Sequence, residues 1–246
     1  MNPNFRIDLS PLDEERFGIR SARASNMSTD SLQAVFDFCN THQVKFLIVR
    51  CSTLDLSTTQ AMEQAGFRIM DTLIYYHRDL KASIIFNQDN SHFVRPVRTD
   101  EADIVRRVAI DTFQNYGGHY HADPRLSRVK CDETYASWAE RSVIMRTTGS
   151  EVLVAEDESG IIGLATLRMN SPEEGEGLLF GVTPRARGRR VYSSLMNHAM
   201  DWCQSKGAQR MIISTQITNL TSQRTWIRCG FEPTYSYYTF HRWFDE

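Results

Sequence analysis

The sequence predicts an α/β fold of the α+β kind, in which a mixed central sheet is flanked by helices. Three observations support this prediction. Residues 32–80 match residues 196–244 at a constant offset of 164 without a gap, and each copy reads helix, strand, helix, strand. Between the copies lie two helical segments and three strand-like segments. At residues 181–195, a strand runs into a basic, glycine-containing turn and then into a helix, which is the order that α/β proteins use to bind phosphate.

The repeat is carried by identical residues as well as by pattern. In the first copy we expect a helix at 31–39, a buried strand at 46–49, a helix at 58–65 and a returning strand from Phe67 to about His77. The second copy repeats these elements from Ser193 to Trp243. Glycines end the helices, at Gly66 in the first copy and at Gly207 and Gly230 in the second. Eight positions are identical: Asp37/Asp201, Cys39/Cys203, Ile48/Ile212, Leu56/Leu220, Gly66/Gly230, Phe67/Phe231, His77/His241 and Arg78/Arg242.

The segment between the copies occurs only once. Thr99 is a suitable N-cap for a helix, which the Gly117-Gly118 pair ends. A loop then carries residues 119–124, before another helix begins near Asp132. The apolar face of the first helix comprises Ile104, Val105, Val108, Ala109 and Phe113.

Three strands follow this pair of helices. Residues 152–155 and 161–169 are separated by a turn at 157–160 and form a predicted hairpin, and 178–182 forms the third strand. Residues 1–85 then supply half of such a unit without its basic turn. We therefore expect two domains, 1–85 and 86–246, with the boundary in the polar stretch before Phe93.

Composition limits the function classes. The net charge is −2 and no run of about 18 apolar residues occurs, so we expect neither a nucleic-acid partner nor a membrane span. Residues 1–12 lack the apolar core of a secretory signal. The five cysteines are an odd number without a C-x-x-C pair, which favours reduced thiols in the cytoplasm and no metal site.

The basic turn carries a resemblance to a known family. Gly181–Leu195 resembles the acetyl-CoA signature of the GNAT superfamily of N-acyltransferases, and Arg187 and Gly188 match it well. Arg190 and Tyr192 stand where the family has small residues, and their side chains are expected to narrow the approach of the pyrophosphate. The element order from Val94 onward is also that of the GNAT fold. The resemblance implies these residues for CoA binding: Leu179, Phe180, Val182, Arg187, Gly188, Arg189, Arg190, Val191, Tyr192, Asn219 and Trp226.

Within the superfamily, the chain resembles two-domain nucleotide-sugar acetyltransferases. This resemblance depends on residues 16–19, on 121–124 with Tyr135 and Trp138, and on 238–243. It implies direct transfer of an acetyl or small acyl group from acyl-CoA to the amine of a nucleotide-linked aminodeoxysugar, such as a dTDP-amino-dideoxyhexose used for surface polysaccharide. No metal takes part in this reaction, and a homodimer is a further expectation.

Acid–base residues are assigned less directly. His119 and His121 lie on the loop that looks like the family's acceptor segment, and either is a candidate base. The acceptor-binding set is His119, Tyr120, His121 and Asp123. In similar enzymes a tyrosine protonates the CoA thiolate, but Trp226 holds that position here. Tyr238 is the candidate acid, and the alternatives are Tyr192, Tyr235, Tyr237, a water or a thiolate that leaves unprotonated.

Other assignments stay open. His77 and His241 recur in both copies, which favours a structural role for both. Two alternatives to the sugar acetyltransferase remain at this point: a GNAT enzyme acting on another small-molecule or protein amine, and a binding module that no longer admits CoA.

Overall fold

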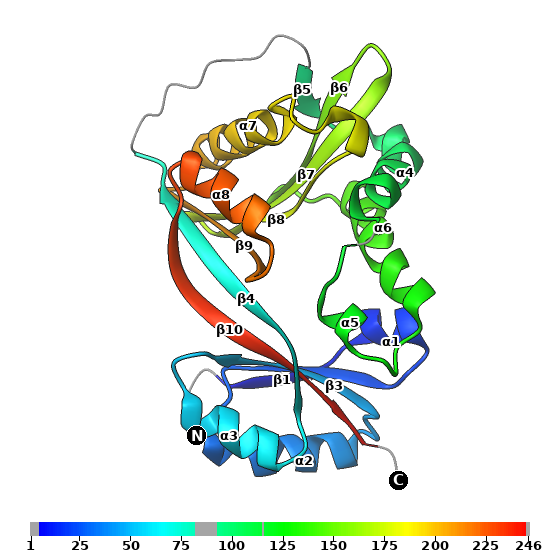
Figure 1. Ribbon diagram of the computed structural model, residues 1–246, viewed down its shortest axis with the longest axis vertical. Helices are drawn as coiled ribbons and strands as arrows, with labels where there is room; N and C mark the ends of the chain where they lie inside the picture. The colour runs from blue at the N-terminus through cyan, green and yellow to red at the C-terminus, as the bar shows by residue number, and fades with distance from the viewer. Residues whose placement is uncertain (1–4, 82–92, 115, 245–246) are drawn as a thin grey trace.

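The computed structural model describes residues 5–81, 93–114 and 116–244. Their strands form one mixed sheet of ten strands in the order β1-β2-β3-β10-β4-β9-β8-β7-β6-β5 (Figure 1). The strands are β1 Arg6–Leu9, β2 Ser21–Ser25, β3 Phe46–Ser52, β4 Arg68–Asp79, β5 Phe93–Pro96, β6 Ser150–Asp157, β7 Gly160–Ser171, β8 Glu174–Val182, β9 Arg210–Gln216 and β10 Glu232–Trp243.

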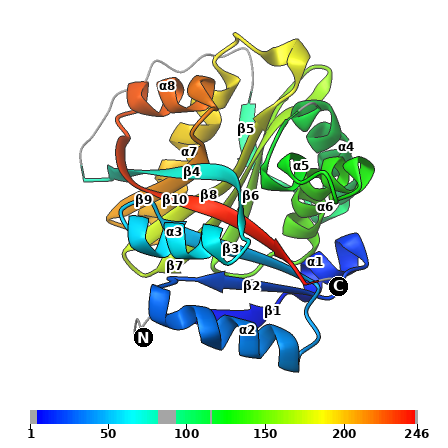
Figure 2. The same cartoon turned by 60° about the horizontal axis from the view of Figure 1, so that its bottom comes forward.

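Helices cover both faces of this sheet. Figure 2 places α4, α5 and α6 on one side of strands β6 to β8 and α7 on the other. In the part of the chain that the structure describes, the α-helices are α1 Pro11–Phe17, α2 Leu32–Thr41, α3 Leu56–Gln64, α4 Ala102–Phe113, α5 His119–Ala122, α6 Arg128–Ile144, α7 Val191–Ser205 and α8 Leu220–Arg228.

Strand β7 separates two hydrophobic cores. Its side chains alternate between the faces except at a register shift against β6, where Glu156 pairs with Ile161 and Ala155 with Gly163. Because Ile162 is the extra residue, Ile162 and Ala165 pack in the core with α7, whereas Ile161 and Leu164 pack in the core with α4 and α6. A further core lies between β2, β3, β10 and the helices α2 and α3.

The repeat is present element by element. Strands β3 and β9, helices α3 and α8, and strands β4 and β10 begin and end 164 residues apart. Asp55 caps α3 by accepting from the Thr58 amide at 3.0 Å, and Asn219 caps α8 by accepting from the Ser222 amide at 3.3 Å. The sequence prediction of a repeated helix–strand–helix–strand unit is therefore confirmed at the level of element bounds.

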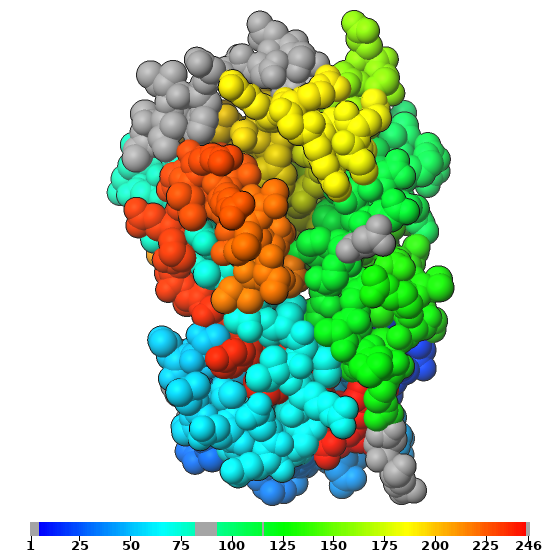
Figure 3. Space-filling model, viewed as in Figure 1, coloured from blue at the N-terminus to red at the C-terminus, as the bar shows by residue number. Residues whose placement is uncertain are grey.

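The two copies exchange their last strands, which the sequence did not predict. Strand β10 pairs with β3, strand β4 pairs with β9, and β4 and β10 pair with each other. The registers are related by the offset of the repeat, with Leu73 opposite Tyr237 at the centre. Figure 3 shows the red surface of the C-terminal strand set among the cyan and blue surface of the first 80 residues. The strands of the described residues therefore form one continuous sheet across both parts of the chain.

Smaller differences concern the loops. The third predicted strand begins earlier, at Glu174, and residues 119–122 form the one-turn helix α5 where a loop was expected. The proposed domain boundary falls mainly on residues outside those described. All five cysteines are buried and unpaired. Among the described residues, none of the helices combines the length and apolar character that a membrane crossing requires.

Candidate active site

The site lies where two parallel strands separate. Strand β8 pairs with β9 only from Glu174 to Gly177, although it continues to Val182. A register shift between β7 and β8 occurs at the same level, between Thr166 and Leu167. Beyond Gly177 one edge of β8 therefore has no strand neighbour among the described residues, and its backbone groups there are available to bind a ligand. A cavity of about 470 Å³ opens there.

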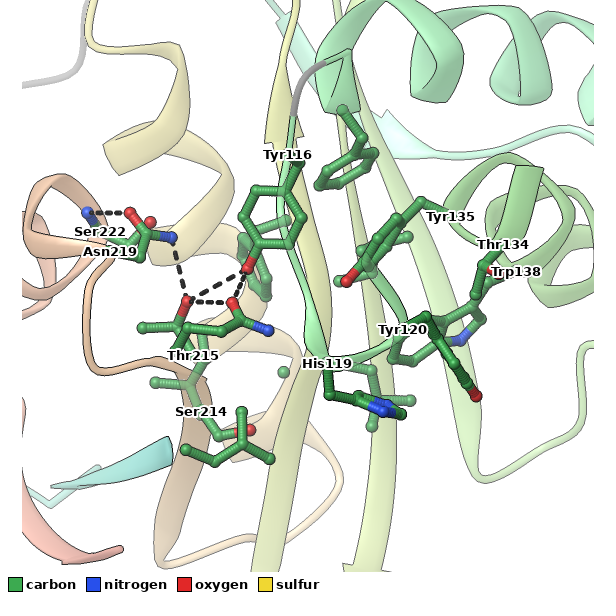
Figure 4. Close-up of a pocket in the computed structure, with 18 of the residues that line it drawn as sticks. Tyr116, His119, Tyr120, Thr134, Tyr135, Trp138, Ser214, Thr215, Asn219 and Ser222 are labelled. Carbon is green, nitrogen blue, oxygen red and sulfur yellow. Dashed lines mark hydrogen bonds between the residues drawn. The ribbon is translucent and has the colours of Figure 1, made fainter. Parts of the chain in front are cut away.

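Side chains from both parts of the chain line this cavity. Figure 4 shows Tyr116, Tyr135 and His119 along one wall and Ser214 and Thr215 along the facing wall. Leu179, Phe180, Tyr192, Asn219 and Trp226 also line it, so the cavity collects five of the residues predicted to bind CoA. The remaining lining residues are Ser10, Leu12, Arg16, Arg23, Arg50, Leu73, Phe113, Tyr120, Thr134, Trp138, Gly177, Leu178, Ile213, Gln216 and Ser222.

The basic turn leads into helix α7 with unusual backbone angles. Gly188 has φ +79°, and a Cβ added there would meet no atom within 4 Å. Arg190, the N-cap of α7, has φ +58°, which a non-glycine residue rarely adopts. The first intrahelical bond runs from the Ser194 amide to the Arg190 carbonyl, so the amides before it point outward from the helix start. Such a helix start favours anions.

The arginines of this turn contact different groups. The Arg189 guanidinium is 2.9 Å from the Asp157 carboxylate, and Arg185 is 3.7 Å from the same side chain. Arg187 reaches the Thr112 carbonyl at 3.5 Å. Asp157 therefore holds the turn against the β6–β7 hairpin while Gly188 stays exposed.

Tyr192 points into the cavity instead of toward the turn. Its hydroxyl accepts a hydrogen bond from the Trp226 indole at 2.9 Å, and its ring lies 5.8 Å from that of Phe180. Burial raises the pKa of Tyr192, and the hydrogen bond from Trp226 opposes that increase. The expected crowding of the turn by Tyr192 therefore does not occur, because the side chain belongs to the cavity wall.

A buried chain of hydrogen bonds ends at His119. The Asp123 carboxylate is 2.8 Å from Nδ1 of His241, and Nε2 of His241 is 2.8 Å from Nδ1 of His119. The Trp243 indole donates to the same carboxylate oxygen of Asp123 at 2.9 Å. The side chains of His241 and Asp123 are 0% and 2% exposed, so water does not compete for these bonds.

The network fixes the tautomers. A carboxylate only accepts, so Nδ1 of His241 donates to Asp123 and its Nε2 accepts from Nδ1 of His119 when both rings are neutral. Nε2 of His119 then carries a lone pair. Burial lowers the pKa of His119 well below 6.5, and the charges of His241, Arg23 and Arg50 lower it further. Near neutral pH, His119 is a neutral ring with an unprotonated nitrogen.

The structure separates the two candidate bases. His121 is outside the cavity lining: its Nδ1 accepts from the Gly118 amide at 3.1 Å and its Nε2 lies 3.2 Å from Asp132. The candidate acid Tyr238 is also outside the lining and packs with the core of the first 80 residues. His77 contacts Thr234 at 2.7 Å, so it and His241 have unlike surroundings despite their place in the repeat.

Asn219 contributes to a polar cluster on the β9 side. Its amide donates to the Thr215 hydroxyl at 3.0 Å, which lies 3.4 Å from the Tyr116 hydroxyl. Tyr116 also bonds to the side chain of Gln216. These contacts join α8 to the segment before α5 and hold the two cavity walls together (Figure 4).

Sequence reasoning missed the lining residues from the first part of the chain, among them three arginines. Arg16 on α1, Arg23 on β2 and Arg50 on β3 face the same cavity as His119. No local motif marks the three as a set, because they are spread over 35 residues and only the strand exchange brings them to the site. Among the residues with described positions, no three His, Cys, Asp or Glu side chains gather as a metal site would require.

Known proteins resemble this chain in sequence and structure. The model of the acetyltransferase (GNAT) family matches residues 109–231. The dTDP-fucosamine acetyltransferase of Escherichia coli O6:H1 is 25% identical over 245 residues, covering 96% of this chain and 99% of that protein. The spore coat polysaccharide biosynthesis protein SpsD of Bacillus subtilis is 24% identical over 148 residues, which span 60% of this chain and 50% of SpsD.

Solved structures share the fold. A GCN5-related N-acetyltransferase from Sphaerobacter thermophilus superposes with a TM-score of 0.64 at 13% identity, covering 96% of this chain and 76% of that one. At this level of identity the likeness concerns the fold alone. The predicted fold class is thereby confirmed.

Proposed function

The chain belongs to the acetyltransferase (GNAT) family and is an acyl-CoA-dependent N-acyltransferase, and we propose that it acetylates the amine of a nucleotide-linked aminodeoxysugar. One observation carries this proposal: the opening between β8 and β9 continues into a cavity that ends at an unprotonated nitrogen of His119. A thioester held in that opening would face an amine that His119 can deprotonate.

CoA is assigned to the start of α7 and the free edge of β8. The family uses acetyl-CoA, whose pyrophosphate suits the outward-pointing amides between Gly188 and Tyr192. The pantetheine arm would follow β8 from Val182 toward Leu179, where the edge lacks a strand partner. Backbone amides there would polarise the thioester carbonyl, and such preorganised groups are usually the largest contribution to catalysis.

The nitrogen must lose two protons and the sulfur must gain one. Nε2 of His119 takes the first proton from the acceptor ammonium, and the amine nitrogen then attacks the thioester carbon. The imidazolium that forms would be stabilised through His241 by the Asp123 carboxylate. As the carbon–sulfur bond breaks, the departing thiolate takes the proton of Tyr192, and the Tyr192 oxygen takes the second proton of the nitrogen. Tyr192 therefore ends neutral, and the Trp226 indole holds its oxygen in place during the exchange.

The acceptor class is supported by the shape of the site and by the relatives. Residues of α1, β2 and β3 close the cavity on the His119 side, which favours a small acceptor over a protein segment. The names of two relatives refer to a dTDP-linked amino sugar and to a coat polysaccharide. We propose surface polysaccharide synthesis as the role and the cytoplasm, where nucleotide sugars are made, as the location.

The test combines binding and turnover. Calorimetry with acetyl-CoA comes first, followed by release of CoA thiol and mass spectrometry with a panel of dTDP- and UDP-linked amino sugars. We expect acetyl-CoA binding and acetylation of at least one member of the panel. Acetylation of protein N-termini or polyamines with no turnover of any nucleotide sugar would refute the acceptor class, and absence of acetyl-CoA binding would refute the donor site.

The donor site has its own prediction. We expect Gly188→Glu to raise the Kd for acetyl-CoA at least tenfold, about 1.4 kcal/mol, because the new carboxylate would stand beside the phosphates. Its side chain would point into open space, since nothing lies within 4 Å of the added Cβ. Calorimetry with acetyl-CoA measures the change.

Gly207→Glu is the matched control. Gly207 also has a positive φ of +94° and follows the other end of α7. Both variants therefore introduce a negative side chain in a left-handed conformation, but only one lies at the proposed phosphate site. Equal affinities in the two variants would place CoA elsewhere.

A further inference from the structure

The cavity wall contributed by the first part of the chain is strongly basic. Arg16, Arg23 and Arg50 line it, and the described lining residues include no Asp or Glu. These arginines come from α1, β2 and β3, elements outside the region that matches the family model. A cavity with three guanidinium groups and no carboxylate in its lining is suited to an anionic ligand.

The three arginines differ in the bonds that their guanidinium groups already make to other protein groups. Arg23 is held by the buried Asp13 through bonds of 2.6 and 2.9 Å. Arg50 donates to the Tyr75 hydroxyl at 3.2 Å. Asp71, whose pKa burial raises, acts on Arg50 only through space.

Arg16 is the least satisfied of the three. Its Nε is buried and has no hydrogen-bond partner among the described residues. A buried donor without a partner is energetically costly. A ligand oxygen in the cavity would supply the missing acceptor.

The anion cannot be assigned to the phosphates of CoA on this geometry. The proposed CoA turn precedes α7 in the upper part of the molecule, whereas α1, β1 and β3 lie in the lower part (Figure 1). His119 lies beside this basic wall, because its ring is 3.9 Å from that of Tyr120, whose hydroxyl bonds to Arg23. The anion is therefore part of the ligand that His119 deprotonates, which is the acceptor.

We propose that Arg16, Arg23 and Arg50 bind the diphosphate of the acceptor, so that the first part of the chain acts as a nucleotide-sugar clamp. This inference rests on the proposed function. Guanidinium groups pair with phosphate oxygens in a planar, two-bonded geometry that ammonium groups cannot reproduce. Arg23 bonds to Asp13 and Tyr120, so its guanidinium group would already be held in position before the diphosphate binds.

The clamp also acts on the base. The positive charges of Arg23 and Arg50 lower the pKa of His119, and a bound diphosphate would offset them. Acceptor binding would then raise the proton affinity of Nε2 when the ammonium is beside it. The groups that face His119 are His241, Tyr120, Arg23, Arg50 and, farther away, His121.

The test uses Arg16→Gln and Arg50→Gln with two acceptors, the nucleotide-linked amino sugar and the methyl glycoside of the same amino sugar. We expect KM for the nucleotide sugar to rise about ten- to a hundredfold, the usual effect of losing a charged hydrogen bond. KM for the glycoside and the Kd for acetyl-CoA should not change. Arg20→Gln is the control, because Arg20 pairs with Glu14 at 3.0 Å outside the cavity lining.

Binding of free dTDP and UDP by calorimetry tests the clamp even if no acceptor is turned over. If the protein binds dTDP or UDP and both Gln variants weaken this binding at least tenfold, the clamp is supported. A lack of turnover would then mean that the panel did not contain the right amino sugar. Equal losses with nucleotide sugar and glycoside would make the arginines structural, and weakened acetyl-CoA binding would assign them to the donor. No nucleotide diphosphate binding in the unaltered protein would also overturn the inference.

Discussion

We expect His119→Ala to lower kcat/KM for the acceptor by about 10²–10⁴, the usual loss when a general base is removed. The Kd for acetyl-CoA should stay nearly unchanged, because His119 lies on the acceptor side of the cavity. Stopped assays of CoA thiol release over a range of acceptor concentrations give kcat/KM, and calorimetry gives the Kd.

The pH profile distinguishes a base from a binding contact. The base is active when neutral, so activity should fall on the acid side as the pH drops through the lowered pKa of His119, below 6.5. His119→Ala should abolish this limb. Arg50→Gln removes a neighbouring positive charge and should move the limb to higher pH.

His121→Ala is the matched control for His119→Ala. Its ring is bonded to Gly118 and Asp132 away from the cavity, so acceptor kinetics and the acid limb should both persist. If His121→Ala were the damaging variant and His119→Ala harmless, the proposed base would be wrong.

The second large effect concerns stability. Phe240→Ala should lower the free energy of unfolding by about 3–5 kcal/mol, as expected for truncating a fully buried phenylalanine. Phe240 lies on β10, is 0% exposed and packs in the core formed with β2, β3, α2 and α3. Urea unfolding followed by fluorescence and by loss of acetyl-CoA binding measures the change.

The strand exchange determines how this unfolding proceeds. Because β10 connects β3 with β4, both parts of the chain should unfold in one transition. Phe93→Ala is the control, since Phe93 lies on the edge strand β5 and is 62% exposed. Separate transitions for the first part of the chain and for acetyl-CoA binding would contradict the single cooperative unit.

The repeat could be predicted well because its signals are local. Glycines after the helices and apolar strand runs indicate where most elements lie. The cap at Asp55 was not used in the prediction, so the helix expected from Thr58 begins two residues earlier, at Leu56. The exchange of β4 and β10 could not be predicted in this way. Strand β4 pairs with β9 and strand β10 pairs with β3, and in each pair the two strands are far apart in the sequence. No local pattern of residues indicates which partner each strand takes.

The candidate site was predictable only in part. His119 and His121 are two residues apart, and on the helical turn α5 such residues point to different sides. A loop prediction could not choose between them. The roles of Tyr192 and the three arginines depend on side-chain direction and on contacts across more than 90 residues of sequence, such as that between Arg23 and Tyr120. Neither the direction of a side chain nor a contact between distant residues can be recognised from a short stretch of sequence.

The exchange of β4 and β10 also determines the order in which the two parts of the sheet can form while the chain is being synthesised. Strand β4 is already made when β9 emerges, so the later part can finish its sheet at once. Strand β3, by contrast, ends at Ser52 and must wait for β10, which begins at Glu232. At ordinary translation rates the delay is about 10–40 s. Throughout that time an apolar strand edge remains unpaired, so the part of the protein made first is the last to be protected from aggregation.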